Sequence, residues 1–168
     1  MGLVQVATTV SDGSATYLDV TGIDSDDVYM VAYTSIRTTQ NNEGNQLRVL
    51  KSSSQDSTSN YDQAHKHFST TTSYSNGYQS NASQFQIHDN SDDDNGGSQG
   101  FIYCYNFNSS SEYSFVTFEN VSTVSNQQMS NMGGGVHTVA SASNGVRMIG
   151  NSGNAFKSGA RLTLYKVT

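Results

Sequence analysis

The stretch FIYCYNFNSSSEYSFVTFE, Phe101 to Glu119, decides the fold of this chain. Aromatic and β-branched residues recur at every second position in its two halves, and a polar break at Asn108 to Ser111 separates the halves. Such alternation around a short polar break predicts an antiparallel β-hairpin. Both faces of the two strands carry apolar side chains, unlike a strand with one face in water. We therefore expect a second sheet of the same domain to cover one face, and a further layer or another subunit to cover the other.

Other segments repeat the period-two pattern. Val28 to Arg37 carries apolar side chains on both faces, as the hairpin does. The expected strands are 3–10, 15–20, 28–37, 46–51, 85–88, 101–107, 113–119, 136–142, 146–149 and 162–167. About nine or ten short strands without a helical pattern predict an all-β fold. We expect an antiparallel, jelly-roll-like β-sandwich that forms one domain over residues 1–168.

Turn signals suggest how these strands are joined. A polar segment at Thr38 to Asn45 predicts that strands 28–37 and 46–51 form a hairpin. Asn144-Gly145 is the best two-residue hairpin turn, because a type I′ turn needs positive φ at both central positions. Gly133 to Gly135 predicts a flexible turn. Ser52 to Gln84 is rich in Ser, Thr, Asn and Gln but contains aromatic residues throughout, so it predicts ordered loops and short strands.

Composition excludes several classes of protein. Charged residues make up 13% of the chain, against about 25% in a typical soluble domain. The net charge is -6, and the eight Lys and Arg are scattered, so we expect no nucleic-acid binding. No apolar stretch is long enough to span a membrane, and Met1 to Val10 lacks the pattern of a secretory signal. We expect a soluble protein that does not insert into membranes, in which Cys104 is a buried apolar side chain.

The densest acidic cluster is Asp89 together with Asp92 to Asp94. Carboxylates at this density can bind calcium, which takes six to eight oxygen ligands. The candidate ligands are Asp89, Asp92 and Asp94. An EF-hand is excluded, because position twelve counted from Asp92 is Tyr103 and no bidentate Glu follows. A solvated turn is the simpler interpretation, so we expect no cofactor and keep calcium as the alternative.

Two histidines, His65 and His67, would share a face of a strand and could begin a zinc site. Further ligands would have to come from His88, His137 or an aspartate, and no spacing links these residues. A surface or inter-subunit histidine pair is the simpler interpretation.

Catalytic motifs are missing from the sequence. No G-x-S-x-G elbow selects one of the many serines as a nucleophile, and Gly133 to Gly135 lacks the lysine of a phosphate-binding loop. No pair of carboxylates has a recognisable spacing for glycoside hydrolysis. We therefore expect that the protein is not an enzyme.

Tyr61, Tyr74 and Tyr78 lie in the polar segment and are candidate interaction residues. Tyrosine rings can stack on sugars while Asn, Asp and Gln hydrogen-bond to the hydroxyl groups, so a glycan-binding surface is chemically feasible. Alternatively, these tyrosines anchor loops to the sandwich or fill a subunit contact.

Four segments carry a resemblance to a known group of proteins. They are TYLDVTGIDSDDVYMV (16–31), LRVLKSSSQDSTSNYDQAHK (47–66), GFIYCYNFNSSSEYSFVTFE (100–119) and FKSGARLTLYKV (156–167). In this order they resemble small virion structural proteins of tailed phages, especially marine and cyanobacterial ones. Lys166 stands where the closing segment of such proteins usually has Gly. The resemblance implies a structural module of the capsid surface or tail fibre, and it carries over no catalytic residues.

These observations lead to one expectation and one alternative. We expect a separate gene product that acts as a non-enzymatic structural protein on the virion exterior, a capsid decoration or fibre-type accessory subunit. It would associate with itself, as a trimer, and with other virion proteins, and the candidate self-association residues are Tyr29, Tyr33, Tyr103 and Tyr105. The alternative is a tail-fibre or receptor-binding module that recognises host surface glycans.

Overall fold

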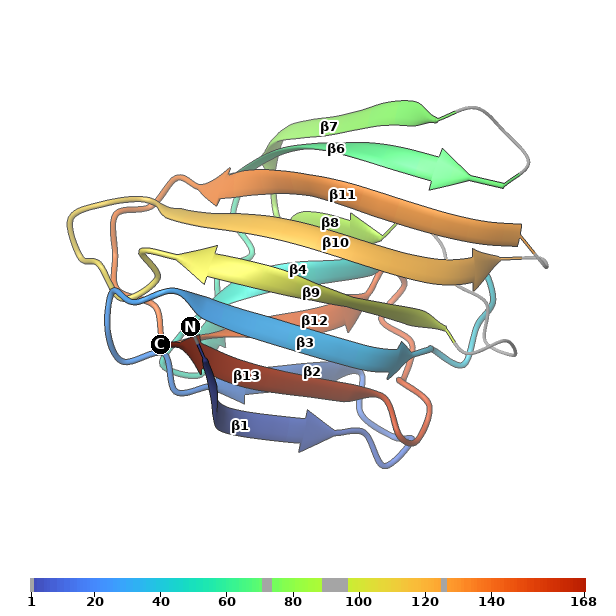
Figure 1. Ribbon diagram of the computed structural model, residues 1–168, viewed down its shortest axis with the longest axis horizontal. Coiled ribbons are helices and arrows are strands. Elements are labelled where there is room, and N and C mark those ends of the chain that lie inside the picture. The colour runs from blue at the N-terminus through green and yellow to red at the C-terminus, as the bar shows by residue number, and fades with distance from the viewer. Residues whose placement is uncertain (1, 71–73, 89–96, 125–126) are drawn as a thin grey trace.

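Two stacked antiparallel β-sheets form the fold in the computed structural model, which describes residues 2–70, 74–88, 97–124 and 127–168 (Figure 1). These ranges contain thirteen strands and no helix. The strands are β1 (Leu3–Val10), β2 (Tyr17–Thr21), β3 (Tyr29–Ile36), β4 (Asn45–Lys51), β5 (Ser54–Gln55), β6 (Tyr61–Ser69), β7 (Ser75–Ala82), β8 (Phe85–His88), β9 (Ser98–Tyr105), β10 (Ser114–Val124), β11 (Gln127–His137), β12 (Gly145–Gly150) and β13 (Arg161–Val167). The predicted antiparallel β-sandwich is confirmed, with more strands than the nine or ten expected.

The two sheets differ in size. The large sheet has eight strands in the order β1-β13-β3-β9-β10-β11-β6-β7, and the small sheet has the order β2-β12-β4-β5, with β8 also paired to β4. In Figure 1 the large sheet lies in front, and the small sheet lies behind its central and lower strands. The edge strand β7 and its neighbour β6 extend beyond that cover, and the exposure of their side chains increases from β6 to β7.

The hydrophobic core lies between the sheets. Tyr29, Val31 and Tyr33 point inward from β3, and Ile102 and Cys104 point inward from β9. The small sheet contributes the buried side chains of Leu18, Val20, Leu47, Val49, Val146 and Met148. Each large apolar side chain that is fully buried stabilises the fold by roughly 1.5–3 kcal/mol relative to exposure. Cys104 is fully buried in this core, as predicted, and burial raises the pKa of its thiol to about 12.

The hairpin predicted from Phe101 to Glu119 is confirmed as β9 and β10. Tyr105 lies opposite Phe115, and Phe101 lies opposite Glu119, in one continuous antiparallel register. Because side chains alternate between the faces of a strand, Val116 and Phe118 enter the core while Phe115 and Thr117 face outward. The described residues therefore cover only one apolar face of the hairpin.

Two segments differ from the expectation, which was ordered loops and short strands for Ser52 to Gln84 and a flexible turn for Gly133 to Gly135. Most of the segment Ser52 to Gln84 forms β6 and β7, and Gly133 to Gly135 lies in the middle of β11 instead of in a turn. Glycine is needed at this point of β11 because a Cβ on Gly135 would come within 2.7 Å of the Phe85 ring of β8. The polar composition of β7 suits an edge strand that few neighbours cover.

Two predicted connections are wrong. β3 and β4 follow each other in the chain but belong to different sheets, so they do not form a hairpin. The expected strand 136–142 ends at His137, and Gly145 begins β12, which pairs with β2 and β4. A turn signal shows where a chain reverses, but it does not show which strand the next segment pairs with.

Candidate interaction surfaces

The outer face of the large sheet carries a cluster of aromatic and sulfur-containing side chains. We call it the aromatic face; it consists of Phe101, Tyr103, Tyr105, Phe115 and Met132. The first three lie at alternate positions of β9, with ring centroids 5.7 Å apart for Phe101 and Tyr103 and 6.4 Å apart for Tyr103 and Tyr105. Phe115 of β10 is 44% exposed, and Met132 of β11 is equally open to solvent. This is the face that the sequence predicted to need a cover.

A shallow trough crosses the aromatic face. It consists of three depressions of about 340, 440 and 500 Å³, and neighbouring depressions share lining residues. Small residues form its floor where Thr117, Gly134 and Ala64 lie side by side on β10, β11 and β6. The hydroxyl groups of Tyr105 and Thr117 are 3.3 Å apart.

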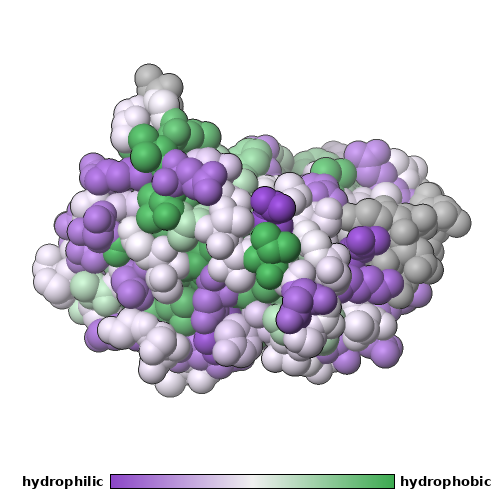
Figure 2. Space-filling model, turned by 90° about the horizontal axis from the view of Figure 1, so that it is seen from below, coloured by the Kyte–Doolittle hydropathy of each residue, from purple (hydrophilic) through white to green (hydrophobic). Residues whose placement is uncertain are grey.

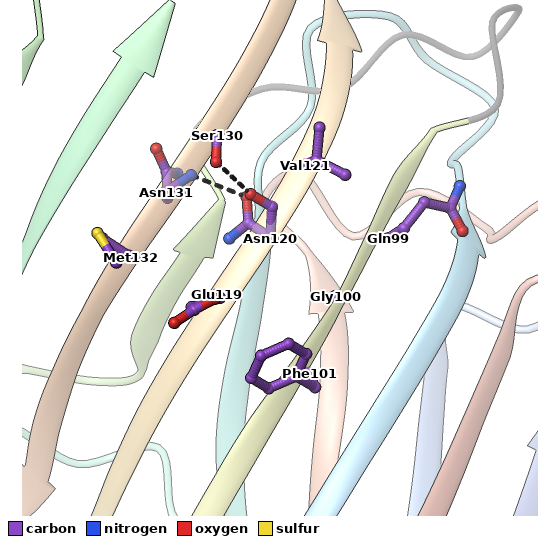
Figure 3. Close-up of a pocket in the computed structure, with 9 residues that line it drawn as sticks. All are labelled: Gln99, Gly100, Phe101, Glu119, Asn120, Val121, Ser130, Asn131 and Met132. Carbon is purple, nitrogen blue, oxygen red and sulfur yellow. Dashed lines mark hydrogen bonds between the residues drawn. The ribbon is translucent and has the colours of Figure 1, made fainter.

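Figure 3 shows the first depression, at the end of the trough that β9, β10 and β11 form together. Asn120 links β10 to β11 below this depression. The Asn131 backbone N–H donates to the side-chain oxygen of Asn120 over 3.3 Å, and the Ser130 hydroxyl donates to the backbone carbonyl of Asn120 over 2.8 Å. The Asn120 amide donates in turn to the Ile87 carbonyl of β8 over 2.6 Å. These bonds join the large sheet to β8 of the small sheet beneath the depression.

The trough is lined mainly by apolar and aromatic side chains and by small residues. Among the described residues, Glu119 is the one ionisable side chain besides the tyrosines that lines the first two depressions, and Asp62 lines the third. Among the residues that the structure describes, no three His, Cys, Asp or Glu side chains gather closely enough to hold a metal ion. The trough can therefore bury apolar groups and stack rings.

The four candidate self-association tyrosines divide into two pairs. Tyr103 and Tyr105 lie on the aromatic face. Tyr29 and Tyr33 are fully buried in the core, so their prediction as contact residues is wrong. The Tyr29 hydroxyl donates to Asp24 over 2.6 Å, and burial raises the pKa of Tyr33 far above its usual value. The alternation along β3 is real, but the small sheet covers the face that carries these two rings.

Of the three candidate glycan-binding tyrosines, two are exposed and one is buried. Tyr74 and Tyr78 are 66% and 82% exposed at the β7 edge of the large sheet. The Lys66 ammonium lies 5.1 Å above the Tyr74 ring. Tyr61 is fully buried, and its hydroxyl accepts from the Val49 backbone N–H and donates to the Asp56 carbonyl, so its prediction as a surface residue is wrong.

The four histidines that were considered as zinc ligands do not come together at one site. His65 and His67 lie half-buried on the inward side of β6. His88 is buried beside Ser122 and Asn131, and His137 contacts Asp56 at the other end of the sandwich. The candidate calcium ligands Asp89, Asp92 and Asp94 fall outside the described residues.

A second apolar surface is the free edge of the large sheet. β1 pairs only with β13 there, and it exposes Leu3, Val4, Val6 and Val10. Figure 2 views the molecule from this side and shows apolar patches among polar side chains. Unpaired backbone groups along an apolar edge strand can pair with a strand of another chain.

A polar cleft on the small sheet was not predicted. Arg48 of β4 and Arg147 of β12 face outward from directly opposite positions. The cleft around the two arginines has a volume of about 420 Å³. It is lined by polar residues that include Tyr17, Gln46 and Gln55. Both arginines occupy polar positions in otherwise apolar strand patterns, QLRVLK and VRMI, and this was the signal in the sequence.

Comparison of the chain with protein-family models, with curated proteins and with solved structures finds no match in any of the three. In the described part of the chain, no helix has the length and apolar character needed to cross a membrane.

Proposed function

We propose that this protein is a non-enzymatic structural subunit that associates with copies of itself, of the kind found on the exterior of tailed-phage virions. The aromatic face is the observation that carries the proposal. Monomeric soluble proteins rarely leave large contiguous apolar patches open to water, and interface cores are enriched in Tyr, Phe and Met. The resemblance of four sequence segments to small virion proteins supports the virion location.

Two separate apolar surfaces favour a ring over a two-fold dimer. A two-fold interface uses the same patch on both subunits, whereas a ring joins one patch to a different patch on the next subunit. The aromatic face and the β1 edge are two such different patches on one sheet. We therefore propose a trimer in which the β1 edge of one copy contacts the aromatic face of the next.

Light scattering after size-exclusion chromatography tests the proposal. The wild-type protein should have three times the chain mass of 18.1 kDa. Tyr103→Glu places a charge at the centre of the aromatic face and should give monomers. Tyr78→Glu is the matched control, because Tyr78 belongs to the same cross-strand row but lies at the far edge of the sheet.

Val4→Lys tests the other contact, since an edge lysine is a device by which natural sheets avoid pairing. Val4 is 54% exposed, so the variant should fold normally and lose the trimer. A wild-type protein that is monomeric at micromolar concentration would rule the proposal out.

Recognition of host glycans is the second candidate function, and the exposure of Tyr74 and Tyr78 favours it. Their rings stand open at one edge of the large sheet, where a sugar could stack. Loss of host adsorption in a Tyr74→Ala, Tyr78→Ala double variant of the virion would support this function over a purely structural one.

A further inference from the structure

We propose that the cleft on the outer face of the small sheet, hereafter the arginine cleft, binds an acidic saccharide and holds its carboxylate between Arg48 and Arg147. This inference goes beyond the proposed structural function and uses the opposite side of the sandwich from the aromatic face. It rests on the charge balance of the cleft, the fixed geometry of its donors and its neutral polar lining.

Like charges face each other at the centre of the arginine cleft. Arg48 and Arg147 are cross-strand neighbours in the β4–β12 register, and both point away from the core. Directly opposed like charges destabilise a sheet unless something compensates them. Asp19 lies opposite Arg147 on the other neighbouring strand, β2, and is the one carboxylate in this row of described residues.

Asp19 compensates only Arg147. Its two carboxylate oxygens accept from Nε and Nη2 of Arg147, both over 2.7 Å. This hydrogen bonding raises the pKa of Arg147 further above its usual value. The guanidinium also lies 3.7 Å from the centroid of the Tyr17 ring, so Arg147 is held on two sides and its Nη1 group remains available.

Arg48 is paired with neutral groups. Its Nε donates to the Ser83 carbonyl over 3.1 Å, and its Nη2 donates to the Gln84 side chain over 3.0 Å. No aspartate or glutamate lines the cleft among the residues described. Arg48, Arg147 and Asp19 together leave one positive charge uncompensated in a protein whose net charge is -6. Arg48 therefore has both a free charge and free N–H groups for an anion.

The two fixed guanidinium groups suit a carboxylate. A planar guanidinium offers parallel N–H donors that match the two oxygens of a carboxylate, and its hydrogen bonds to an anion are about twice as strong as neutral ones. One uncompensated charge matches one carboxylate. A polyanion such as nucleic acid would instead need a basic stripe, which this chain lacks.

The rest of the cleft favours a sugar as the carrier of that carboxylate. Gln46 is nearly buried and donates to both Asn151 and Gln86, over 2.7 and 3.2 Å, which fixes its amide in the floor. Gln55 also lines the cleft, and its side-chain oxygen is buried without a hydrogen-bond partner among the described residues. Tyr17 is 47% exposed at one end and offers an aromatic wall. Alternating donors and acceptors beside a ring match the hydroxyl groups and apolar faces of a saccharide.

Isothermal titration calorimetry of the full chain with 3′-sialyllactose, a trisaccharide that carries one carboxylate, tests this inference. Wild-type protein should bind, and its affinity should fall when sodium chloride is raised from 50 to 500 mM, because salt screens the charge pairing. Arg48→Gln should weaken binding by about 10–100-fold, the range expected for a hydrogen bond to a charged group. Arg161→Gln is the matched control, since Arg161 is an exposed arginine of the large sheet. The Arg161→Gln protein should bind the sugar as tightly as the wild type does.

Lactose, the same sugar without the carboxylate-bearing residue, should bind at least tenfold more weakly than the acidic trisaccharide. Equal binding of the two sugars, salt-independent binding, or no binding by the wild type at millimolar sugar would overturn the inference. So would an unchanged affinity in Arg48→Gln. The salt and sugar comparisons use the wild-type protein and remain decisive if that variant does not fold. A monomeric wild type that binds the acidic sugar would refute self-association while supporting the cleft.

Discussion

His137 Nε2 lies 2.7 Å from the carboxylate Oδ2 of Asp56, although 81 positions separate the two residues. His137 is the last residue of β11, and Asp56 directly follows β5 of the small sheet. The pair therefore joins the ends of the two sheets. Asp56 also accepts hydrogen bonds from the Thr58 backbone N–H over 2.8 Å and from the Asn60 amide over 3.0 Å. One carboxylate thus organises the turn that leads into β6.

The first prediction concerns acid stability. Burial acts to raise the pKa of Asp56, but hydrogen bonds from Thr58, Asn60 and His137 outweigh it and hold the pKa well below its usual value. A carboxyl whose pKa is lower in the folded state stabilises the fold at neutral pH, and this stabilisation is lost as the pH falls below about 4. We expect Asp56→Asn to reduce the free energy of unfolding by about 1–3 kcal/mol at pH 7.

Thermal melts at pH 7 and pH 3 measure this effect. The stability difference between wild type and Asp56→Asn should shrink at pH 3, because the Asp56 carboxyl of the unfolded wild-type chain is then mostly protonated while that of the folded chain stays ionised. Asp26→Asn is the control, as it removes an exposed carboxylate from a turn and should melt like the wild type. Identical melting of Asp56→Asn and wild type at pH 7 would show that the cluster does not stabilise the fold.

The second prediction concerns the buried hydroxyl of Tyr61. It accepts from the Val49 backbone N–H over 3.1 Å and donates to the Asp56 carbonyl over 2.8 Å. Tyr61→Phe keeps the ring, which packs edge-on against Phe85 with centroids 4.9 Å apart, but leaves both backbone groups without this partner. Unfolding in urea should show a loss of about 1–3 kcal/mol, the cost of an unsatisfied buried polar group.

Tyr78→Phe makes the same chemical change on an exposed ring and should alter stability by less than about 0.5 kcal/mol. Equal urea midpoints for the two variants would contradict the structural role assigned to Tyr61.

The third prediction concerns the glycine run in β11. A Cβ on Gly135 would lie 2.6 Å from the Asp62 carbonyl oxygen and 2.7 Å from the Phe85 ring. We expect Gly135→Ala to cost about 1–3 kcal/mol, as overpacking of a core does, because β8 must move away from β11. The free energy of unfolding measures this cost. Gly2→Ala is the control, since its added methyl would contact only the Thr168 hydroxyl at 3.3 Å. A Gly135→Ala protein as stable as wild type would mean that β8 can shift without loss.

The local sequence was sufficient for the parts of the fold in which neighbouring residues decide the structure. The hairpin from Phe101 to Glu119 could be predicted because its two strands are adjacent in the chain and each shows the period-two pattern by itself. The strand bounds at β1, β4, β8, β12 and β13 were close to those expected for the same reason. The sequence indicated only loops and short strands where β6 and β7 lie, because these polar strands derive their order from backbone pairing, which leaves no apolar periodicity.

What the sequence determined by itself was the class of fold and a surplus of apolar strand faces. It could not determine which face of each strand would be covered. Tertiary packing decided this: the small sheet covers Tyr29 and Tyr33 and leaves Tyr103 and Tyr105 outside. Strand register likewise placed Arg48 opposite Arg147, from segments far apart in the chain. The physical reason is the same in both cases, since alternation within a strand is local whereas pairing and stacking of strands depend on contacts distant in sequence.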